Sequence, residues 1–239
     1  MDAILSYLAL SDIEISAILL SLKVAGVAVF VALPLALLVA FLLARYKFPG
    51  RTVLNVLVLL PLVLPPVVTG YMLLIAFGRQ GFIGKFLFET FNFSFAFQWT
   101  GAALAAGVMA FPLMVRPIRQ AIEAVNRDWE VTARTLGAGR LTVFFTIIFP
   151  LALPGLIAAL ILGFAKALGE FGATITFVSN IPDETRTLPL AIYSLLQSPG
   201  DEAGLWRLTI FSIILAIGAV VLSEVMAQRL KRLSGESDA

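Results

Sequence analysis

The sequence predicts an all-α membrane protein, a polytopic bundle with about five transmembrane helices. Of its 239 residues, 60% are hydrophobic and only 13% are charged, and the mean hydropathy of +0.98 lies far above the soluble range. A soluble chain of this length needs a polar surface, and too few charged residues are present to build one. A lipid surround removes that requirement. Since no internal repeat or linker interrupts the pattern, we expect a single transmembrane domain over residues 1–239.

Five apolar stretches approach the roughly 20 residues that a transmembrane helix needs. They run over about 17–43, 53–77, 101–115, 147–167 and 208–226. An aromatic run at 86–97 is interrupted by polar side chains, so we expect an interfacial or re-entrant segment there, with a sixth span as the alternative. Residues 1–15 contain no Lys or Arg, so no cleavable signal is expected and the first stretch stays as an anchor.

The placement of Lys and Arg predicts the orientation, because these residues concentrate on the cytoplasmic side. With the N-terminus outside and the C-terminus inside, the cytoplasmic segments hold eleven basic residues: Arg45, Lys47, Arg51, Arg116, Arg119, Arg127, Arg134, Arg140, Arg229, Lys231 and Arg232. The outside segments hold four: Arg79, Lys85, Arg186 and Arg207. This bias makes the segment 116–150 a cytoplasmic loop followed by re-entry into the bilayer.

Residue types that are missing from the sequence exclude several functions. The chain has no Cys and no His, which excludes disulfides, thiolate and imidazole metal ligands and the commonest general base. It contains no Gly-x-x-x-x-Gly-Lys-Ser/Thr phosphate loop, so metabolic energy must come from another chain. We therefore expect no catalytic residue, metal site or cofactor in this chain, which argues against an intramembrane enzyme. Its basic residues flank the spans and form no nucleic-acid patch.

The cytoplasmic segment 126–140 predicts a short amphipathic helix and then a glycine-interrupted turn. Asn126 or Asp128 suits the helix start, and Gly137 and Gly139 suit a helix stop and close backbone approach. The apolar face consists of residues at helical spacing: Trp129, Ala133 and Leu136. From the pattern alone, this face fits either a groove on a soluble partner or the lipid surface.

The stretch from Glu130 to Gly137, followed after a spacer by Ile148-Phe149-Pro150, resembles the EAA loop of ABC-importer permeases. In that family the loop forms a coupling helix that docks into the ATP-binding subunit. With Gly137 aligned, Glu130 stands one residue early, and Phe149 replaces the usual Leu. The resemblance implies coupling to the ATP-binding subunit by Arg127, Trp129, Glu130, Ala133, Leu136, Gly137 and Gly139.

Further segments resemble the molybdate permease subunits of this family. They cover 60–71, 78–84, 168–182 and 184–189, within a similarity that extends from about 19 to 224. Sulfate permeases share the Gly-Glu-Phe-Gly pattern at 169–172, whereas the Leu-Pro-Pro-Val-Val-Thr-Gly-Tyr run at 64–71 and the compact length favour molybdate.

The resemblance implies a type I importer permease in a bacterial inner membrane, working by alternating access. Its implied partners are a second copy in a homodimer, two ATP-binding subunits that carry ATP and Mg²⁺, and a periplasmic or extracellular oxyanion-binding protein. The implied cargo is molybdate or tungstate. The rival interpretations are a sulfate or thiosulfate permease and a stand-alone secondary transporter.

Breaks and charges within the spans indicate a candidate pathway. Pro65 and Pro66 should break the second span, and irregular backbone at membrane depth occurs only against protein or a wet cavity. Lys166 and Glu170 share a helix face, and each should avoid lipid because a lone charge there costs about 3 kcal/mol. The pathway residues we expect are Pro65, Pro66, Thr69, Lys166, Glu170, Thr174 and Thr176. The alternatives are an ordinary proline kink, a structural ion pair and helix caps.

Two polar features outside the pathway have simpler interpretations. Lys23 is expected to extend its ammonium to the membrane interface. The polar segment 182–206 suits the docking of a binding protein, with a plain solvated loop as the alternative.

Overall fold

The computed structural model describes residues 10–198 and 200–233, and every regular element among them is a helix. The expectation about an N-terminal signal falls largely on residues 1–9, outside this range. The helices are α2 (Asp12–Arg45), α3 (Arg51–Val63), α4 (Pro66–Phe77), α5 (Phe82–Phe91), α6 (Trp99–Ala124), α7 (Arg127–Thr135), α8 (Arg140–Val143), α9 (Phe149–Leu168), α10 (Gly172–Val178), α11 (Leu188–Gln197) and α12 (Glu202–Leu233). A π-helical turn, Phe144–Ile148, joins α8 to α9. The all-helical fold class is confirmed.

Four helical segments are long and apolar enough to cross a membrane: Asp12–Arg45, Trp99–Ala124, Arg140–Leu168 and Glu202–Leu222. The predicted second span is the pair α3 and α4, bent by 116° at a short break, and the break lies at the expected prolines, Pro65 and Pro66. Counting this pair as one broken span gives up to five spans. The aromatic run at 86–97 contains the end of α5, a helix of 10 residues, which is too short to cross a bilayer.

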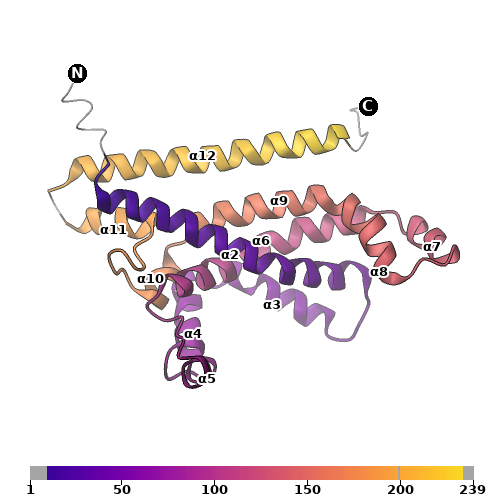
Figure 1. Cartoon of the computed structure of the whole chain (residues 1–239), viewed down its shortest axis with the longest axis horizontal. Coiled ribbons are helices and arrows are strands. Elements are labelled where there is room, and N and C mark those ends of the chain that lie inside the picture. Colours follow the sequence, from indigo (N-terminus) through magenta and orange to yellow (C-terminus); the bar gives the residue numbers. More distant parts are fainter. Residues whose placement is uncertain (1–9, 199, 234–239) are drawn as a thin grey trace.

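The centre of the bundle is α6, which packs against α2 on one side and α9 on the other (Figure 1). Small side chains make this possible, because they let helix backbones approach closely in a membrane. A Cβ on Gly155 would lie 2.7 Å from the Pro117 carbonyl oxygen, and one on Gly163 would lie 2.7 Å from the Met114 side chain. Four of the fully buried residues of α6 are alanines: Ala102, Ala105, Ala106 and Ala110.

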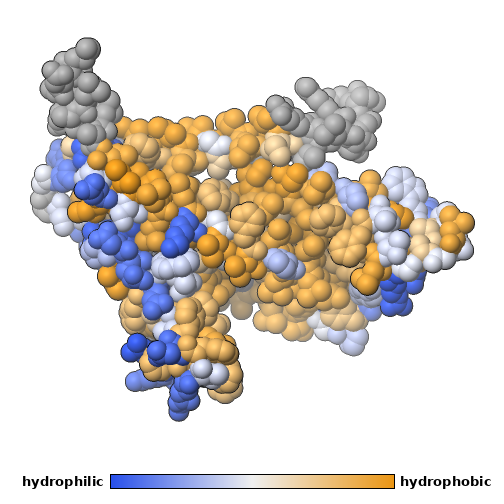
Figure 2. All heavy atoms as spheres, in the orientation of Figure 1, coloured by the Kyte–Doolittle hydropathy of each residue, from blue (hydrophilic) through white to orange (hydrophobic). Residues whose placement is uncertain are grey.

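The remaining helices lie around this centre. α12 runs along α9 and contacts α11 near its beginning, and few residues are buried in its Glu202–Leu222 part. Figure 2 shows hydrophobic side chains over the middle of the molecule and hydrophilic ones gathered towards its two ends, around α7 at one end and around α11 and α5 at the other. This distribution suits a bundle whose middle faces lipid and whose ends face water.

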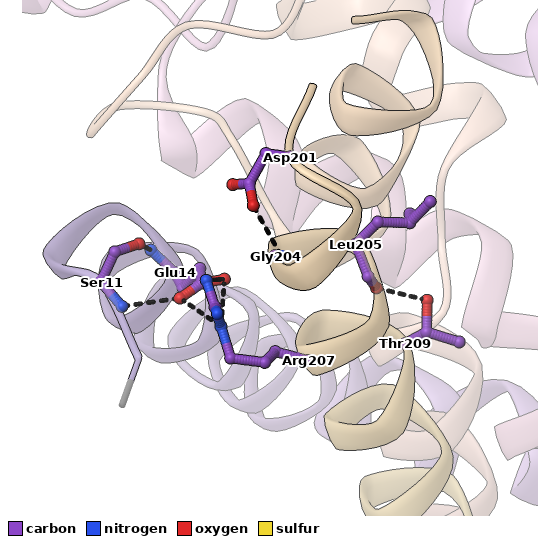
Figure 3. Close-up of polar contacts among 7 residues, drawn as sticks. All are labelled: Ser11, Glu14, Asp201, Gly204, Leu205, Arg207 and Thr209. Atoms are coloured by element: carbon purple, nitrogen blue, oxygen red, sulfur yellow. Dashed lines mark hydrogen bonds and ion pairs between the residues drawn. The ribbon is translucent and has the colours of Figure 1, made fainter. Parts of the chain in front are cut away.

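An ion pair joins the beginnings of α2 and α12 at the α11 end (Figure 3). Arg207 Nη2 lies 2.9 Å from Glu14 Oε1, and Arg207 Nε donates to the same carboxylate. Glu14 also completes a capping box at the start of α2, because it accepts from Ser11 N while Ser11 Oγ accepts from Glu14 N. One carboxylate therefore fixes both the first turn of α2 and the position of α12.

Candidate functional site

Helix α7, for which a coupling role is predicted, begins and ends as its sequence indicates. Asn126 Oδ1 accepts from Asp128 N at 2.9 Å and caps the start. At the end, Gly137 adopts a φ of +91°. Its N–H donates to Arg134 O, and the N–H of Ala138 donates to Ala133 O. These two bonds form a Schellman motif, which needs the left-handed conformation that glycine adopts without a Cβ clash. Gly139 then precedes α8 as its N-cap.

Some side chains of the α7 region are exposed to solvent, and others contact the helix bundle. Trp129 is 54% exposed and Leu136 is 83% exposed, and Arg127 is exposed beside them. Ala133 is half-buried and packs against the bundle core, so the predicted apolar face is only partly solvent-facing. No residue of α7 is fully buried. A large exposed aromatic and a large exposed aliphatic side chain at the water end of a membrane bundle suit contact with a protein partner.

Glu130 attaches α7 to the bundle through Arg45, the last residue of α2. Arg45 Nη2 lies 2.6 Å from Glu130 Oε1 and also donates to the carbonyl oxygen of Val125 at 3.1 Å. The Arg45 side chain is only 7% exposed and that of Glu130 20%. The carboxylate predicted to meet the ATP-binding subunit therefore points towards the bundle and holds α7 against α2. Nothing local in the sequence signals this contact, because the two residues are far apart in the chain.

The second predicted region is built around the break between α3 and α4. Pro65 is the N-cap of α4 and Pro66 its first residue, where a missing N–H costs no helical hydrogen bond. The end of this break packs directly on α10. A Cβ on Gly70 would lie 2.5 Å from the Ala173 carbonyl oxygen, and one on Gly172 would lie 2.7 Å from Pro66 Cβ. The structure thus brings the proline break and the segment after α9 together, and their role in a pathway stays a prediction.

The threonines of this junction are largely buried. Thr69 is 6% exposed, and its hydroxyl has no hydrogen-bond partner within the described part of the chain. Thr174 is 1% exposed. Thr176 is half-buried and its Oγ1 donates to the Gly172 carbonyl oxygen at 2.8 Å, inside its own helix. Their role in a pathway stays a prediction.

Lys166 and Glu170 form an ion pair, with 2.5 Å between Nζ and Oε2. The other carboxylate oxygen, Oε1, accepts from the backbone N–H of Ala173 at 3.0 Å. Glu170 is 3% exposed, so its charge is balanced by Lys166 and by a backbone donor at the start of α10. The pair joins the end of α9 to α10, which is the structural interpretation that the sequence left open. Both residues stay predicted pathway residues.

Polar groups at the α11 end are mostly used within the chain. Asn180 donates to Ser194 Oγ at 2.6 Å and accepts from Arg186 Nε at 3.0 Å. Asp183 accepts from Ser16 Oγ at 3.0 Å. The docking of a binding protein on 182–206 stays a prediction. In the same half of the bundle, Lys23 places its ammonium 3.7 Å from the ring centroid of Trp99, a cation–π contact that the interface expectation missed.

A large cavity of about 750 Å³ opens between α2, α3 and α6. Its walls are aliphatic and aromatic apart from the hydroxyl of Thr100, and include Val31, Leu57 and Phe111. Desolvating an anion in such a cavity is costly because no wall group offers a positive charge. None of the predicted pathway residues lines it.

Comparisons with known proteins agree with this architecture. The family described as binding-protein-dependent transport system inner membrane component matches residues 32–232. The molybdenum transport system permease protein ModB of Escherichia coli (strain K12) is 56% identical over 226 residues, which are 95% of this chain and 99% of the relative. The sulfate transport system permease protein CysT of Salmonella typhimurium is 38% identical over 192 residues, or 79% of this chain and 67% of the relative.

Solved structures show the same fold. A bacterial ABC transporter involved in the import of the acidic polysaccharide alginate aligns with a TM-score of 0.73 at 18% identity, covering 92% of this chain and 80% of that one. The likeness to this importer extends the agreement from sequence to the arrangement of the helices. With a family match over most of its length, the chain belongs to the inner membrane components of binding-protein-dependent transport systems.

Proposed function

We propose that this chain is the permease subunit of an ATP-driven importer that carries molybdate, with tungstate as its close chemical analogue, into the cytoplasm. The observation that carries the proposal is the 56% identity to a molybdenum permease over nearly the whole length of both chains. The identity to a sulfate permease is lower, at 38%, and covers less of each chain. Sulfate or thiosulfate import is therefore the alternative that the experiment below must separate.

In this proposal the chain has no catalytic role of its own. Two copies form a homodimer, and each binds one ATP-binding subunit, which holds ATP and Mg²⁺ and performs the hydrolysis. A periplasmic or extracellular binding protein delivers the oxyanion. The N-terminus lies outside and the C-terminus in the cytoplasm, so that α7 faces the ATP-binding subunit.

A continuous series of contacts supports coupling between α7 and the broken span. The exposed Trp129 and Leu136 give the ATP-binding subunit an apolar contact surface. Arg45 and Glu130 join α7 to α2, α9 packs along α2 and α6, and Glu170 joins the end of α9 to α10. Because α10 packs on Gly70, movement of α7 can reach the proline break without a flexible loop between them. Alternating access then follows if ATP binding favours one arrangement of this series over the other.

Reconstituted transport tests the cargo. We would purify the chain with its ATP-binding subunit, place the complex in proteoliposomes, and measure ATP hydrolysis with molybdate-loaded, tungstate-loaded and sulfate-loaded binding protein. Molybdate or tungstate loading should stimulate hydrolysis and uptake, and sulfate loading should not. Stimulation by sulfate alone would move the chain to the sulfate alternative, and uptake without any ATP-binding subunit would reject the importer altogether.

Single cysteines test the orientation, because the natural chain contains none and each introduced thiol is a unique reporter. Trp129→Cys lies on α7, and Asp183→Cys lies in an exposed loop at the opposite end of the bundle. A membrane-impermeant maleimide added to intact spheroplasts should label the Asp183→Cys protein and label Trp129→Cys only after lysis. The reverse pattern would contradict the proposed orientation.

A further inference from the structure

Besides the large apolar cavity, the structure contains a small, strongly basic cavity at the α7 end. Its volume is about 270 Å³, and it lies between the end of α2, helix α7, and the beginning of the α8–α9 segment. The residues that line it are Phe41, Arg45, Tyr46, Arg127, Glu130, Val131, Arg134, Arg140, Val143 and Ile148. Four arginines and one glutamate therefore line one partly open cavity.

The charges in this cavity are not balanced by the chain. Glu130 is held by Arg45. Arg127, Arg134 and Arg140 make no ion pair with any residue in the described part of the chain. Two nearby carboxylates do not line the cavity: Asp128 is exposed on α7, and Glu123 is paired with Arg119 at 2.8 Å. Like charges in one cavity repel each other, so the arrangement leaves room for an anion that this chain does not supply.

A buried donor points to the same conclusion. The side chain of Arg45 is more than nine-tenths buried, yet its Nε finds no hydrogen-bond partner among the described residues. An unpaired buried donor of a charged group costs free energy. Arg45 lines the cavity, and its planar guanidinium suits the oxygens of a tetrahedral phosphate.

The position of the cavity relative to the spans indicates which kind of molecule could supply the anion. Arg45 ends one candidate span and Arg140 begins another, so the cavity lies where two spans end, and lipid phosphates are found beyond the ends of spans. Phe41, Val143 and Ile148 give it an apolar wall next to the guanidinium groups. Basic pockets between membrane helices at this depth bind the headgroups of anionic lipids.

We propose that the cavity bounded by Arg45, Arg127, Arg134 and Arg140 is a binding site for a phosphate group, supplied by an anionic phospholipid or by free phosphate. An occupant would bridge α7 to both spans that end at this point. The site is distinct from the predicted pathway residues, which lie around α4 and α10. It therefore stands whether or not the transported anion is molybdate.

Binding to the purified full-length chain tests the proposal. The probe is short-chain dihexanoyl phosphatidylglycerol, titrated below its micellar concentration and followed by calorimetry and native mass spectrometry. Dihexanoylglycerol, which has the same chains and no phosphate, is the matched ligand control. Saturable binding of the phospholipid and not of the diacylglycerol is expected. Equal binding of both, or no binding of either the phospholipid or inorganic phosphate, would overturn the proposal. Inorganic phosphate is the second probe. Competition by it identifies a site for free phosphate as well, and saturable lipid binding without competition identifies a site for lipid alone.

Variants localise the binding. Arg134→Gln with Arg140→Gln removes two exposed arginines of the cavity, and we expect a loss of affinity of about tenfold or more. Arg45→Lys keeps the positive charge but removes the planar guanidinium with its paired N–H donors, and should weaken binding by a smaller factor. The matched control is Arg116→Gln, an exposed arginine outside the cavity. Circular dichroism confirms that each variant is folded. An unchanged affinity in the double variant, or an equal loss in the control, would place the binding elsewhere and reject the site.

Discussion

The junction of α4 with α10 and the attachment of α7 to α2 are built in different ways. In the first, Gly70 lies against the backbone of Ala173 and Gly172 lies against the Pro66 ring, and neither glycine leaves room for a methyl group. In the second, α7 has no fully buried residue and is held through Arg45 and Glu130. A glycine contact has one close-packed arrangement, whereas a long side-chain ion pair can change rotamer and keep its charges together.

The difference indicates which part of the molecule can move relative to which. A partner that pulls on α7 works against side-chain contacts, which rearrange at low cost. The broken span should follow α10 as a unit, because separating them would open a void in a close-packed contact. We therefore expect substitutions at the α4–α10 junction to act mainly on folding, and substitutions at the α7 end to act mainly on coupling.

The largest effect on stability is expected from Gly70→Ala. Its Cβ would lie 2.5 Å from the carbonyl oxygen of Ala173, so α4 and α10 must separate, and we expect a loss of about 2–3 kcal/mol in unfolding free energy. The matched control is Gly26→Ala within α2, where a Cβ meets nothing within 4 Å and should stabilise the helix by about 0.5–1 kcal/mol. Denaturant unfolding of the purified proteins measures both. Equal behaviour of the two variants would show that the junction is loosely packed.

The next effect concerns the attachment of α7. Glu130→Gln should cost about 1–2 kcal/mol, less than the 3–5 kcal/mol of a fully buried pair, because the carboxylate is partly exposed. A double-mutant cycle with Arg45→Gln isolates the interaction energy between the two side chains. Glu123→Gln, which breaks the more exposed pair with Arg119, is the control and should cost less than about 1 kcal/mol. A coupling energy near zero for Arg45 and Glu130 would show that α7 is held by something else.

Much of this arrangement follows from local sequence signals. Apolar length predicted the spans, and the cap at Asn126 and the stop at Gly137 were predictable because each depends on residues within one helical turn. The contact of Lys166 with Glu170 follows from a spacing of four on a helix. The break at Pro65 and Pro66 was predictable in position, since proline removes a helix donor, but its angle depends on what it packs against.

The long-range side-chain contacts could not be predicted. The sequence around Glu130 would look the same whether its side chain faced a partner subunit or Arg45. The spacing of apolar residues does not distinguish these two orientations. Similarly, nothing near Lys23 in the sequence indicates Trp99 as its neighbour. The basic cavity could not be predicted from the sequence for the same reason. Its arginines were counted as membrane flanks from three separate segments, and only the folded chain brings those segments together.

A similar effect on stability, and a larger one on coupling, is expected from Gly137→Val. A β-branched residue at a φ of +91° is strained by about 1–2 kcal/mol, and relief of this strain would turn the end of α7. Gly50→Val is the matched control, since Gly50 has a φ of +90° and, like Gly137, open space where a Cβ would lie. Both variants should insert into the membrane, but only Gly137→Val should hydrolyse ATP in the assembled transporter without matching uptake. Normal transport by the Gly137→Val protein would contradict a coupling role for this turn.

The smallest effect on stability is expected from Leu136→Ser, and it separates the two interpretations of the apolar side of α7. Leu136 is 83% exposed, so it buries almost nothing in the free chain and its loss should change stability by no more than about 0.5 kcal/mol. If an ATP-binding subunit receives this side chain, affinity for that subunit should fall by about 2 kcal/mol, as measured by surface plasmon resonance on nanodiscs. Leu141→Ser is the control, because Leu141 is 75% exposed on neighbouring α8. If Leu136 instead rests on lipid, the variant should bind the subunit normally, and a fluorophore on α7 should report greater exposure to water. Retained affinity together with that spectral change would assign this side of α7 to the membrane surface.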